Sequence, residues 1–217
     1  MGAAAGLLAA ITLGYLLGAI PFGVIVARLA GGEDPRGVGS QRTGATNAFR
    51  ALGIGWGVTV GLLDVAKGLV AAGAGAAIGS AVGLAPEWVA AGSCVAAVTG
   101  HIRSVFIGFR GGRGVATAAG GFLFLVPAAL LFMIPIMGAV VALTRYVSLA
   151  SIVGAASAPL VVAGLWWSQR ASLADVAYAA VVGLLIIVAH ADNLARLRAG
   201  TERRVGGGPV AGSGTNP

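Results

Sequence analysis

Charge is what this 217-residue chain has least of. Only 10% of its residues are charged, whereas 58% are hydrophobic. A soluble domain carries roughly 25% charged residues, so this deficit excludes a water-facing surface of ordinary extent. Stretches without Asp, Glu, Lys or Arg cover 2–27, 68–86, 88–102, 114–144 and 146–169. Several reach the ~20 residues that a helix needs to cross a bilayer. The sequence therefore predicts an all-α polytopic membrane protein.

Cysteine and early basic residues are also scarce. The single cysteine, Cys94, excludes an intrachain disulfide, and we expect it to be a small core residue inside a span. No Lys or Arg precedes Arg28, so the first apolar run lacks the basic region of a cleaved signal peptide. We therefore expect that run to span the membrane. Glycine, in contrast, is abundant: its 37 copies suit close helix packing in lipid.

The placement of the basic residues predicts the topology. Twelve of the 14 fall into four clusters, within 28–50, 103–113, at Arg145 and within 196–204. The positive-inside rule assigns all four clusters to the cytoplasmic side. This requires an outside N-terminus and about seven spans, which we place near 3–27, 58–82, 88–103, 115–128, 129–144, 147–168 and 174–190. The segment 114–144 is short for two crossings, but Pro127 and Pro135 favour a short hairpin or bent helices there.

The expected domain organisation is simple. We predict one membrane-embedded domain over residues 1–204. The segment 205–217, VGGGPVAGSGTNP, is rich in glycine, proline and serine. Such a composition is typical of a disordered tail.

Polar chemistry is concentrated in the predicted cytoplasmic segments. The first, GSQRTGATNAFR over 39–50, combines hydroxyls, amides and two arginines with two glycines that can bend the chain. Arginine grips phosphate oxygens with a planar fork, which favours a phosphate site. A plain turn also uses Ser, Thr and Asn, and Thr46 or Asn47 could cap the helix that follows.

The second polar segment is rich in glycine and arginine. It reads GHIRSVFIGFRGGRGVAT over 100–117 and leads into an apolar run. Backbone amides at a glycine-rich turn before a helix can form an anion site. It is no P-loop, because the G-x-x-x-x-G-K-[ST] order is absent. An RNA-binding RGG segment would be solvated and usually repeated, so we expect no nucleic-acid partner; a positive anchor at the membrane edge is the plain alternative.

Two smaller groups complete the candidates. His190, Asn193 and Arg196 share one helix face if the last helix continues through them, although a helix end at the interface would look similar. Asp64 and Lys67 lie one turn apart within a predicted span. Charges at membrane depth usually face the bundle interior. These two either neutralise each other as a structural ion pair or place Lys67 in a substrate cavity.

Read together, these segments resemble the bacterial acyl-phosphate:glycerol-3-phosphate acyltransferase family over nearly the whole chain. The family's first motif is similar to Gly39-Ser40 and GATNAFR over 44–50. Its second is similar to Gly100-His101 and FRGGRGVAT over 109–117. Its third is similar to His190-x-x-Asn193, Arg196-Leu197 and Gly200-Thr-Glu202. LDVAKG over 63–68 and RYVSLAS over 145–151 fit as well.

The chain departs from the family pattern at three places. Gln41-Arg42-Thr43 follow Ser40 where Ser-Gly-Asn is common, and Ser104 replaces a frequent proline. Arg110 and Arg113 stand where the glycine-rich loop usually has lysines. Guanidinium keeps the charge but does not deprotonate, so Arg113 is expected to act electrostatically.

The resemblance implies transfer of a fatty acyl group from acyl phosphate to the 1-hydroxyl of glycerol 3-phosphate, with no cofactor and no metal. It implies that Ser40, Arg50, Arg113, His190 and Asn193 hold glycerol 3-phosphate. Thr46, Asn47 and the amides around Gly111, Gly112 and Gly114 would hold the acyl phosphate head. The further candidate binding residues are Arg42, Lys67, His101 and Glu202.

No side chain is an obvious nucleophile with a base beside it. We therefore favour direct transfer in which a substrate phosphate takes the hydroxyl proton, with His101 and His190 as alternative bases. The implied setting is a bacterial plasma membrane, where the protein contacts the lipid bilayer and a soluble enzyme that makes acyl phosphate. A small transporter would suit the intramembrane Asp64 and Lys67, but it predicts polar groups on both membrane faces. A non-catalytic scaffold leaves the three polar motifs unexplained.

Overall fold

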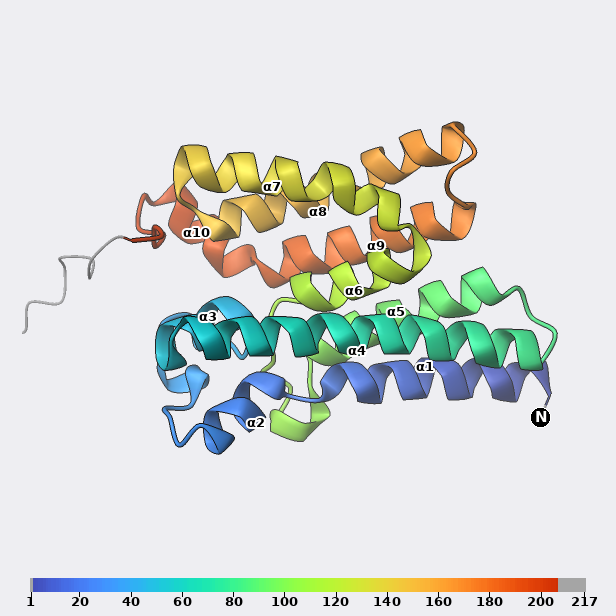
Figure 1. The fold of residues 1–217 in the computed structure, drawn as a ribbon, viewed down its shortest axis with the longest axis horizontal. Helices are drawn as coiled ribbons and strands as arrows, with labels where there is room; N and C mark the ends of the chain where they lie inside the picture. The colour runs from blue at the N-terminus through green and yellow to red at the C-terminus, as the bar shows by residue number, and fades with distance from the viewer. Residues whose placement is uncertain (1, 207–217) are drawn as a thin grey trace, which may run out of the picture.

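The apolar runs form helices in the computed structural model, which describes residues 2–206. No strand occurs among those residues, so the predicted all-α class is confirmed. The helices are α1 (Ala3–Ala19), α2 (Phe22–Leu29), α3 (Ala45–Leu52), α4 (Ile54–Ala81), α5 (Pro86–Ile102), α6 (Val115–Leu125), α7 (Leu130–Thr144), α8 (Val147–Trp167), α9 (Leu173–Ala189) and α10 (Ala191–Arg198). Figure 1 shows α1, α4 and α5 on one side of the molecule, α7, α8 and α9 on the other, and α6 between them.

The long helices correspond closely to the predicted spans. Within residues 2–206, five helical stretches are long and apolar enough to cross a membrane, and six if the bent pair α9–α10 is one span. The first of them runs from Ala3 to Leu29 and includes the break between α1 and α2. The chain is a multi-pass membrane protein. The number seven and the outside N-terminus stay predictions.

The segment 114–144 differs from the expected pair of similar spans. α6 ends at Leu125, so it is shorter than the predicted 115–128 and too short to cross a bilayer as a straight helix. A 3-10 turn over Pro127–Ala129 follows, and α7 then continues through an internal proline, Pro135. Pro127 thus breaks the helix because its ring removes a backbone donor, as the sequence indicated.

Glycine brings the backbones of α1, α4 and α5 into contact with their neighbours. A Cβ on Gly14 would overlap the Ser93 carbonyl of α5, and one on Gly18 would overlap that of Ala97. The single hydroxyl hydrogen of Ser93 is shared between carbonyls of α1 and α4, at Ala10 (3.1 Å) and Ala71 (2.8 Å). In lipid, such close approach replaces the hydrophobic effect as the source of helix association. This half of the bundle is therefore tightly joined.

A second core lies where α5, α6 and α9 meet. Tyr178 on α9 is 1% exposed, packs edge-on against Phe122 with ring centroids 5.0 Å apart, and donates to the Ala118 carbonyl at 2.8 Å. Cys94 is fully buried with its Sγ 3.3 Å from the Tyr178 hydroxyl. The prediction of Cys94 as a core residue is confirmed.

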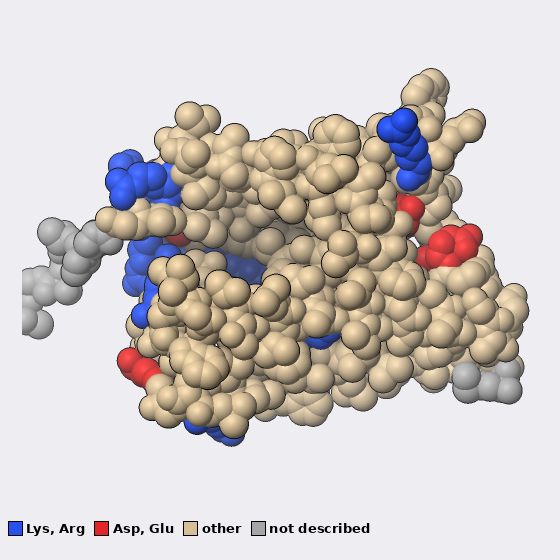
Figure 2. All heavy atoms as spheres, viewed as in Figure 1, with Lys and Arg blue, Asp and Glu red and all other residues tan. Residues whose placement is uncertain are grey.

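The polar segments gather at one end of the bundle, where α3 and α10 lie and where Figure 2 shows most of the Lys and Arg side chains. Residues 199–206, which we call the C-terminal strap, fold back on this end: the Val205 amide donates to the Arg145 carbonyl at 2.8 Å. Residues 205 and 206 of the predicted tail form a turn, and the domain boundary at residue 204 stays a prediction. The remainder of the predicted tail, 207–217, lies outside the described residues.

Candidate active site

A cavity of about 730 Å³ connects the polar end of the molecule with the bundle interior. This volume is within the usual range for a small-molecule site, roughly 300–1,000 Å³. Its mouth is lined by α3 with the loop before it, the start of α6, α10 and the C-terminal strap; its apolar part is lined by α6, α7, α8 and α9. Figure 2 shows the hollow between the α4 and α7 sides, with basic side chains inside it.

Most of the predicted site residues come together here. Those that line the cavity are Ser40, Arg42, Thr46, Asn47, Arg50, His101, Arg113, Gly114, His190, Asn193 and Glu202. Lys67, Gly111 and Gly112 were predicted too but do not line it. Three segments of the sequence thus share one cavity, and the first and the last of them are some 140 residues apart.

Asn47 organises the first polar segment. Its Nδ2, which carries two hydrogens, lies within hydrogen-bond distance of three carbonyls, those of Pro35, Val38 (3.0 Å) and Arg42 (2.9 Å). Its Oδ1 accepts from the Ser40 amide (3.2 Å). The capping interpretation was wrong: α3 begins after Gly44, and no side chain caps it. Asn47 is 2% exposed, so its role is to hold the loop that carries the cavity-lining Arg42.

The glycine-rich loop is anchored to α5 through its backbone. The Gly112 amide donates to the His101 carbonyl at 3.0 Å, and the Gly111 amide to that of Ile102 at 3.2 Å. These two amides are therefore not free for the acyl phosphate head, which corrects our expectation for them. Gly112 must also lack a side chain, because a Cβ at this position would overlap Nε2 of His101. Gly114 adopts φ +86° and turns the chain into α6, and Gly114, Val115 and Ala116 at this turn line the cavity.

Lys67 belongs to a buried charged cluster rather than to the cavity. Its Nζ lies 2.8 Å from Oδ1 of Asp64 and donates to the Ile20 carbonyl at 3.0 Å, where α1 ends. Nδ1 of His101 lies 3.5 Å from the same Asp64 oxygen. The structural ion pair, one of our two alternatives, describes Lys67. Because Asp64 and His101 also line the cavity, the cluster links its wall to the α1–α2 break.

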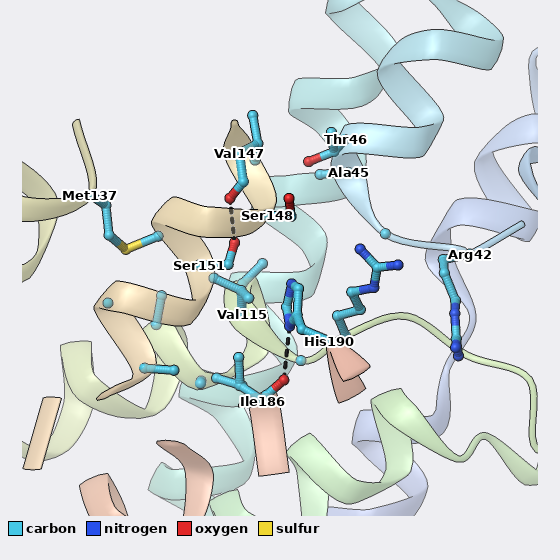
Figure 3. Close-up of a pocket in the computed structure, with 18 of the residues that line it drawn as sticks. Arg42, Ala45, Thr46, Val115, Met137, Val147, Ser148, Ser151, Ile186 and His190 are labelled. Carbon is cyan, nitrogen blue, oxygen red and sulfur yellow. Dashed lines mark hydrogen bonds between the residues drawn. The ribbon is translucent and has the colours of Figure 1, made fainter. Parts of the chain in front are cut away.

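His190 lies at a bend rather than on a continuous helix. The axis turns by 57° between α9 and α10, so the assumption of one helix face through Arg196 was wrong. Nδ1 of His190 lies 2.8 Å from the Ile186 carbonyl (Figure 3). Since a carbonyl only accepts, Nδ1 carries the proton. In the neutral imidazole, Nε2 is then left as an acceptor.

The carboxylates of Asp192 and Glu202 accept hydrogen bonds from the arginines and the amide at the cavity mouth and so fix their positions. Glu202 accepts from the Ser148 hydroxyl (2.9 Å), Asn193 Nδ2 (2.8 Å) and Arg196 Nε (2.8 Å). Asp192 accepts from Arg113 at 2.8 Å. Burial alone would raise the pKa of the Asp192 carboxyl, but the neighbouring guanidinium groups of Arg113 and Arg196 outweigh burial and hold that pKa below its usual value. Both partners of the Arg113 pair are therefore charged.

Several buried polar atoms in the cavity wall have no partner. Within residues 2–206 these include Arg113 Nε, Asn193 Oδ1 and Asp64 Oδ2. An unpaired buried polar atom costs about 1–3 kcal/mol, so its presence in a site wall points to a ligand that completes it. One donor and two acceptors match an anion that also carries hydroxyls. No cluster of three or more His, Cys, Asp or Glu residues suited to a metal occurs in the same described part.

The structure adds residues that the motif interpretation had left out of the site. Ser148 and Ser151 on α8 line the cavity beside His190 (Figure 3), and Asp192 and Arg203 line the mouth together with Arg196 of the third motif. Their i, i+3 spacing could have identified the two serines as polar positions on one face of an apolar helix. The apolar part is lined by residues such as Phe122, Leu130, Met133, Met137 and Ala158. These residues are of the same apolar types as the rest of the spans. The sequence alone therefore does not indicate which of them line a cavity.

Comparison with known proteins gives one consistent result. The profile of the family described as glycerol-3-phosphate acyltransferase matches residues 8–200. A Thermus thermophilus glycerol-3-phosphate acyltransferase is 46% identical over 194 residues, covering 89% of this chain and 92% of the relative. One from Geobacter sulfurreducens is 43% identical over 190 residues, covering 88% of this chain and 93% of the relative.

A solved structure is similar as well: the crystal structure of PlsY (YgiH), an integral membrane glycerol 3-phosphate acyltransferase, in its glycerol 3-phosphate form. The TM-score is 0.80 and the sequences are 39% identical, with coverage of 92% of this chain and 95% of that one. The lysophosphatidic acid form gives 0.78 and 38%, with coverage of 91% and 94%.

Proposed function

This chain belongs to the glycerol-3-phosphate acyltransferase family and is an acyltransferase; from that premise we propose that it acylates the 1-hydroxyl of glycerol 3-phosphate with acyl phosphate as donor. The products are 1-acylglycerol 3-phosphate and phosphate, an early step of phospholipid synthesis. One observation carries the proposal. A single cavity joins a mouth rich in arginine to an apolar chamber between helices, which matches a reaction between a phosphorylated polyol and a lipid.

Glycerol 3-phosphate is assigned to the mouth. Arg50, Ser40 and Arg113 supply donors for its phosphate, and Arg113 Nε is one of the buried atoms without a partner. Asn193 Oδ1 and the open nitrogen of His190 are acceptors that suit the glycerol hydroxyls. Asp192 and Glu202 keep Arg113 and Asn193 in place through the hydrogen bonds already described. The set binds an anion at one end and hydroxyls at the other.

Acyl phosphate is assigned to the junction of mouth and chamber. Its chain lies along α6, α7, α8 and α9, and its phosphate lies at the start of α6, where Gly114 lets the chain turn and the helix dipole favours an anion. Thr46 lines the same side of the cavity. Arg42 adds positive charge to the mouth. A site of this kind draws its lipid substrate from the bilayer and its polar substrate from water.

The chemistry needs positioning more than activation. Acyl phosphate is a mixed anhydride, so the hydroxyl oxygen attacks its carbonyl carbon and the carbon–oxygen bond to phosphate breaks. The hydroxyl proton passes to a phosphate oxygen, which balances the step without an acyl-enzyme. The arginines stabilise charge on the oxyanion and on the departing phosphate. His190, with Nδ1 fixed on the Ile186 carbonyl, is the alternative acceptor because its other nitrogen is open.

The setting follows from the same assignment. We place the protein in a bacterial plasma membrane with its mouth in the cytoplasm, because the basic clusters border that end. Acyl phosphate hydrolyses readily and is amphiphilic. A soluble enzyme that makes it would therefore serve as a partner at the membrane surface.

Product formation tests the proposal. Purified protein in detergent is given acyl phosphate with glycerol 3-phosphate, and lysophosphatidate is followed by mass spectrometry. Glycerol replaces glycerol 3-phosphate in the matched control, because it offers hydroxyls without the phosphate that the arginines bind, and its acylation product, monoacylglycerol, is followed in the same way. We expect product only with the phosphorylated acceptor. Equal acylation of glycerol would remove the arginine mouth from substrate recognition.

A further inference from the structure

The C-terminal strap is fastened across the cavity mouth at several points. Val205 exchanges two hydrogen bonds with Arg145: its amide donates to the Arg145 carbonyl, and its carbonyl accepts from Arg145 Nε at 3.0 Å. Glu202 ties the same strap to α8 and α10. Arg204 donates to the Tyr146 hydroxyl at 3.1 Å and stacks on its ring. Residues between these fixed points therefore have a defined position.

Arg203 is the strap arginine that faces the mouth. It lines the cavity, whereas its neighbour Arg204 lies outside the lining on Tyr146. Nη1 of Arg203 lies 3.1 Å from the point that a Cβ on Gly39 would occupy, and Cδ of Arg50 lies 3.6 Å from the same point. The two arginines, 153 positions apart in the chain, thus converge on the turn that Gly39 forms with φ +57°.

These two guanidinium groups lack carboxylate partners. Across residues 2–206, the ion pairs within 4.0 Å include neither Arg50 nor Arg203. The nearest carboxylate in the strap, Glu202, is already bonded to Ser148, Asn193 and Arg196. Burial, followed by the charge of Arg203, lowers the pKa of Arg50. Two like charges brought together beside an open cavity indicate that an anion completes the arrangement.

We propose that Arg203 is a second phosphate-binding arginine, which joins Arg50 to form the subsite for the phosphate of glycerol 3-phosphate. This inference rests on the proposed function and assigns a residue outside the three sequence motifs. A phosphate monoester carries up to two negative charges and three acceptor oxygens, so two arginines from opposite sides of the mouth match it. Because Arg50 comes from the last turn of α3 and Arg203 from the strap, binding also joins these two segments.

The test compares Arg203→Gln with Arg204→Gln in lipid-free detergent. The two residues are adjacent on the strap and carry equal charge, but only Arg203 lines the cavity. For Arg203→Gln we expect KM for glycerol 3-phosphate to rise about five-fold or more, with KM for acyl phosphate unchanged. Arg204→Gln is expected to change neither constant by more than about two-fold, because the bonds of Glu202 and Val205 still hold the strap in place. Arg203→Lys should recover part of the affinity, since charge remains without the planar fork.

A binding measurement separates this role from a structural one. Without ligand, Arg203→Gln should melt at or slightly above the wild-type temperature, because repulsion with Arg50 is relieved. Glycerol 3-phosphate should then stabilise the variant less than it stabilises wild type. Equal losses in the Arg203 and Arg204 variants would assign the effect to general surface charge, such as lipid headgroup attraction, and overturn the proposal. An unchanged KM in Arg203→Gln, with the wild type active, would overturn it as well; a wild type without activity would instead refute the proposed function.

Discussion

The α1–α4–α5 side of the bundle and α7 are built in opposite ways. On the first side, glycines let helix backbones touch, and their Cβ positions fall on carbonyl oxygens of the neighbouring helix. On α7, Met133 is the buried residue within the helix, and large apolar residues such as Leu131 and Leu143 are 74% and 84% exposed. The first side is joined through close backbone contacts and carries the polar cavity residue His101 on α5. α7 leaves most of its surface exposed in the isolated chain and forms a wall of the apolar chamber.

This difference separates two tasks of an enzyme that works on a lipid. Arginines that recognise a phosphate need fixed positions, which a tightly packed base provides. An acyl chain needs a smooth apolar surface and access from the bilayer. A helix whose outer face is exposed in the isolated chain, and apolar, meets lipid directly. The predictions below test each half of this comparison, in order of decreasing effect.

The largest effect is expected from a bulky residue in the tight half. Gly18→Val places a side chain on the Ala97 carbonyl. A backbone group within a helix cannot change its rotamer to relieve the overlap, as a side chain can. Ordinary overpacking costs about 1–3 kcal/mol, so we expect a larger loss and little folded protein. Gly138→Val in α7 is the matched control, because nothing lies within 4 Å of its Cβ position. Size-exclusion profiles and melting curves in detergent compare the two; similar profiles would contradict the packing difference.

Next in size is the glycine-rich loop. Gly112→Val should lower kcat at least about 100-fold while the protein still inserts, because the new side chain displaces His101 from the loop that leads to Arg113. Gly108→Asn lies in the same loop, where Gly108 has φ +64° and an open Cβ position. Asparagine tolerates that backbone conformation, so activity should persist. Full turnover of Gly112→Val would mean that the loop needs no contact with His101.

Arg50→Ala should weaken glycerol 3-phosphate binding more than it weakens the fold. A charge-assisted hydrogen bond contributes about 1.5–3 kcal/mol, so KM for this substrate should rise about 10- to 100-fold. Arg28→Ala removes the same charge from the neighbouring helix α2 without touching the cavity lining. Its KM should stay within about two-fold of wild type. Initial rates at varied glycerol 3-phosphate concentration give both KM values, and an unchanged KM in Arg50→Ala would remove this residue from the site.

The smallest effect is expected on the lipid-facing surface of α7. Leu131→Ala truncates a side chain that is 74% exposed in the isolated chain, so stability should change by less than about 0.5 kcal/mol. Activity should stay at the wild-type level. A melting curve in detergent checks this, and a large drop would show that α7 packs against something that this chain alone does not display.

The sequence predicted the helices well because each apolar run is long and bounded by charge or glycine. It also identified the family from the ordered motifs, which the comparisons confirm. Eleven predicted residues meet in the cavity because three cytoplasmic segments must share one membrane face. Lys67 could not be assigned, since an ion pair and a cavity residue have the same local pattern. The structure resolved this through the Asp64 and Ile20 contacts.

The misses have a common physical origin. The bonds from Gly111 and Gly112 to carbonyls of α5 are long-range backbone contacts, which no spacing rule contains. The bend at His190 follows tertiary packing, because neither proline nor glycine marks it. Arg203 lies beyond the last motif, and its position depends on how Glu202 and Val205 fasten the strap. Contacts between segments far apart in sequence therefore determine the glycine-rich loop, the bend at His190 and the position of Arg203.

The choice of acyl donor tests the central claim most directly. Purified protein in detergent is given glycerol 3-phosphate with either acyl phosphate or acyl-CoA of equal chain length, and lysophosphatidate is followed by mass. The arginine mouth fits one compact phosphate, and acyl phosphate is activated by the group those arginines stabilise as it leaves. We predict turnover with acyl phosphate and none above background with acyl-CoA. Comparable turnover with acyl-CoA would contradict the assignment of the mouth to a phosphate leaving group.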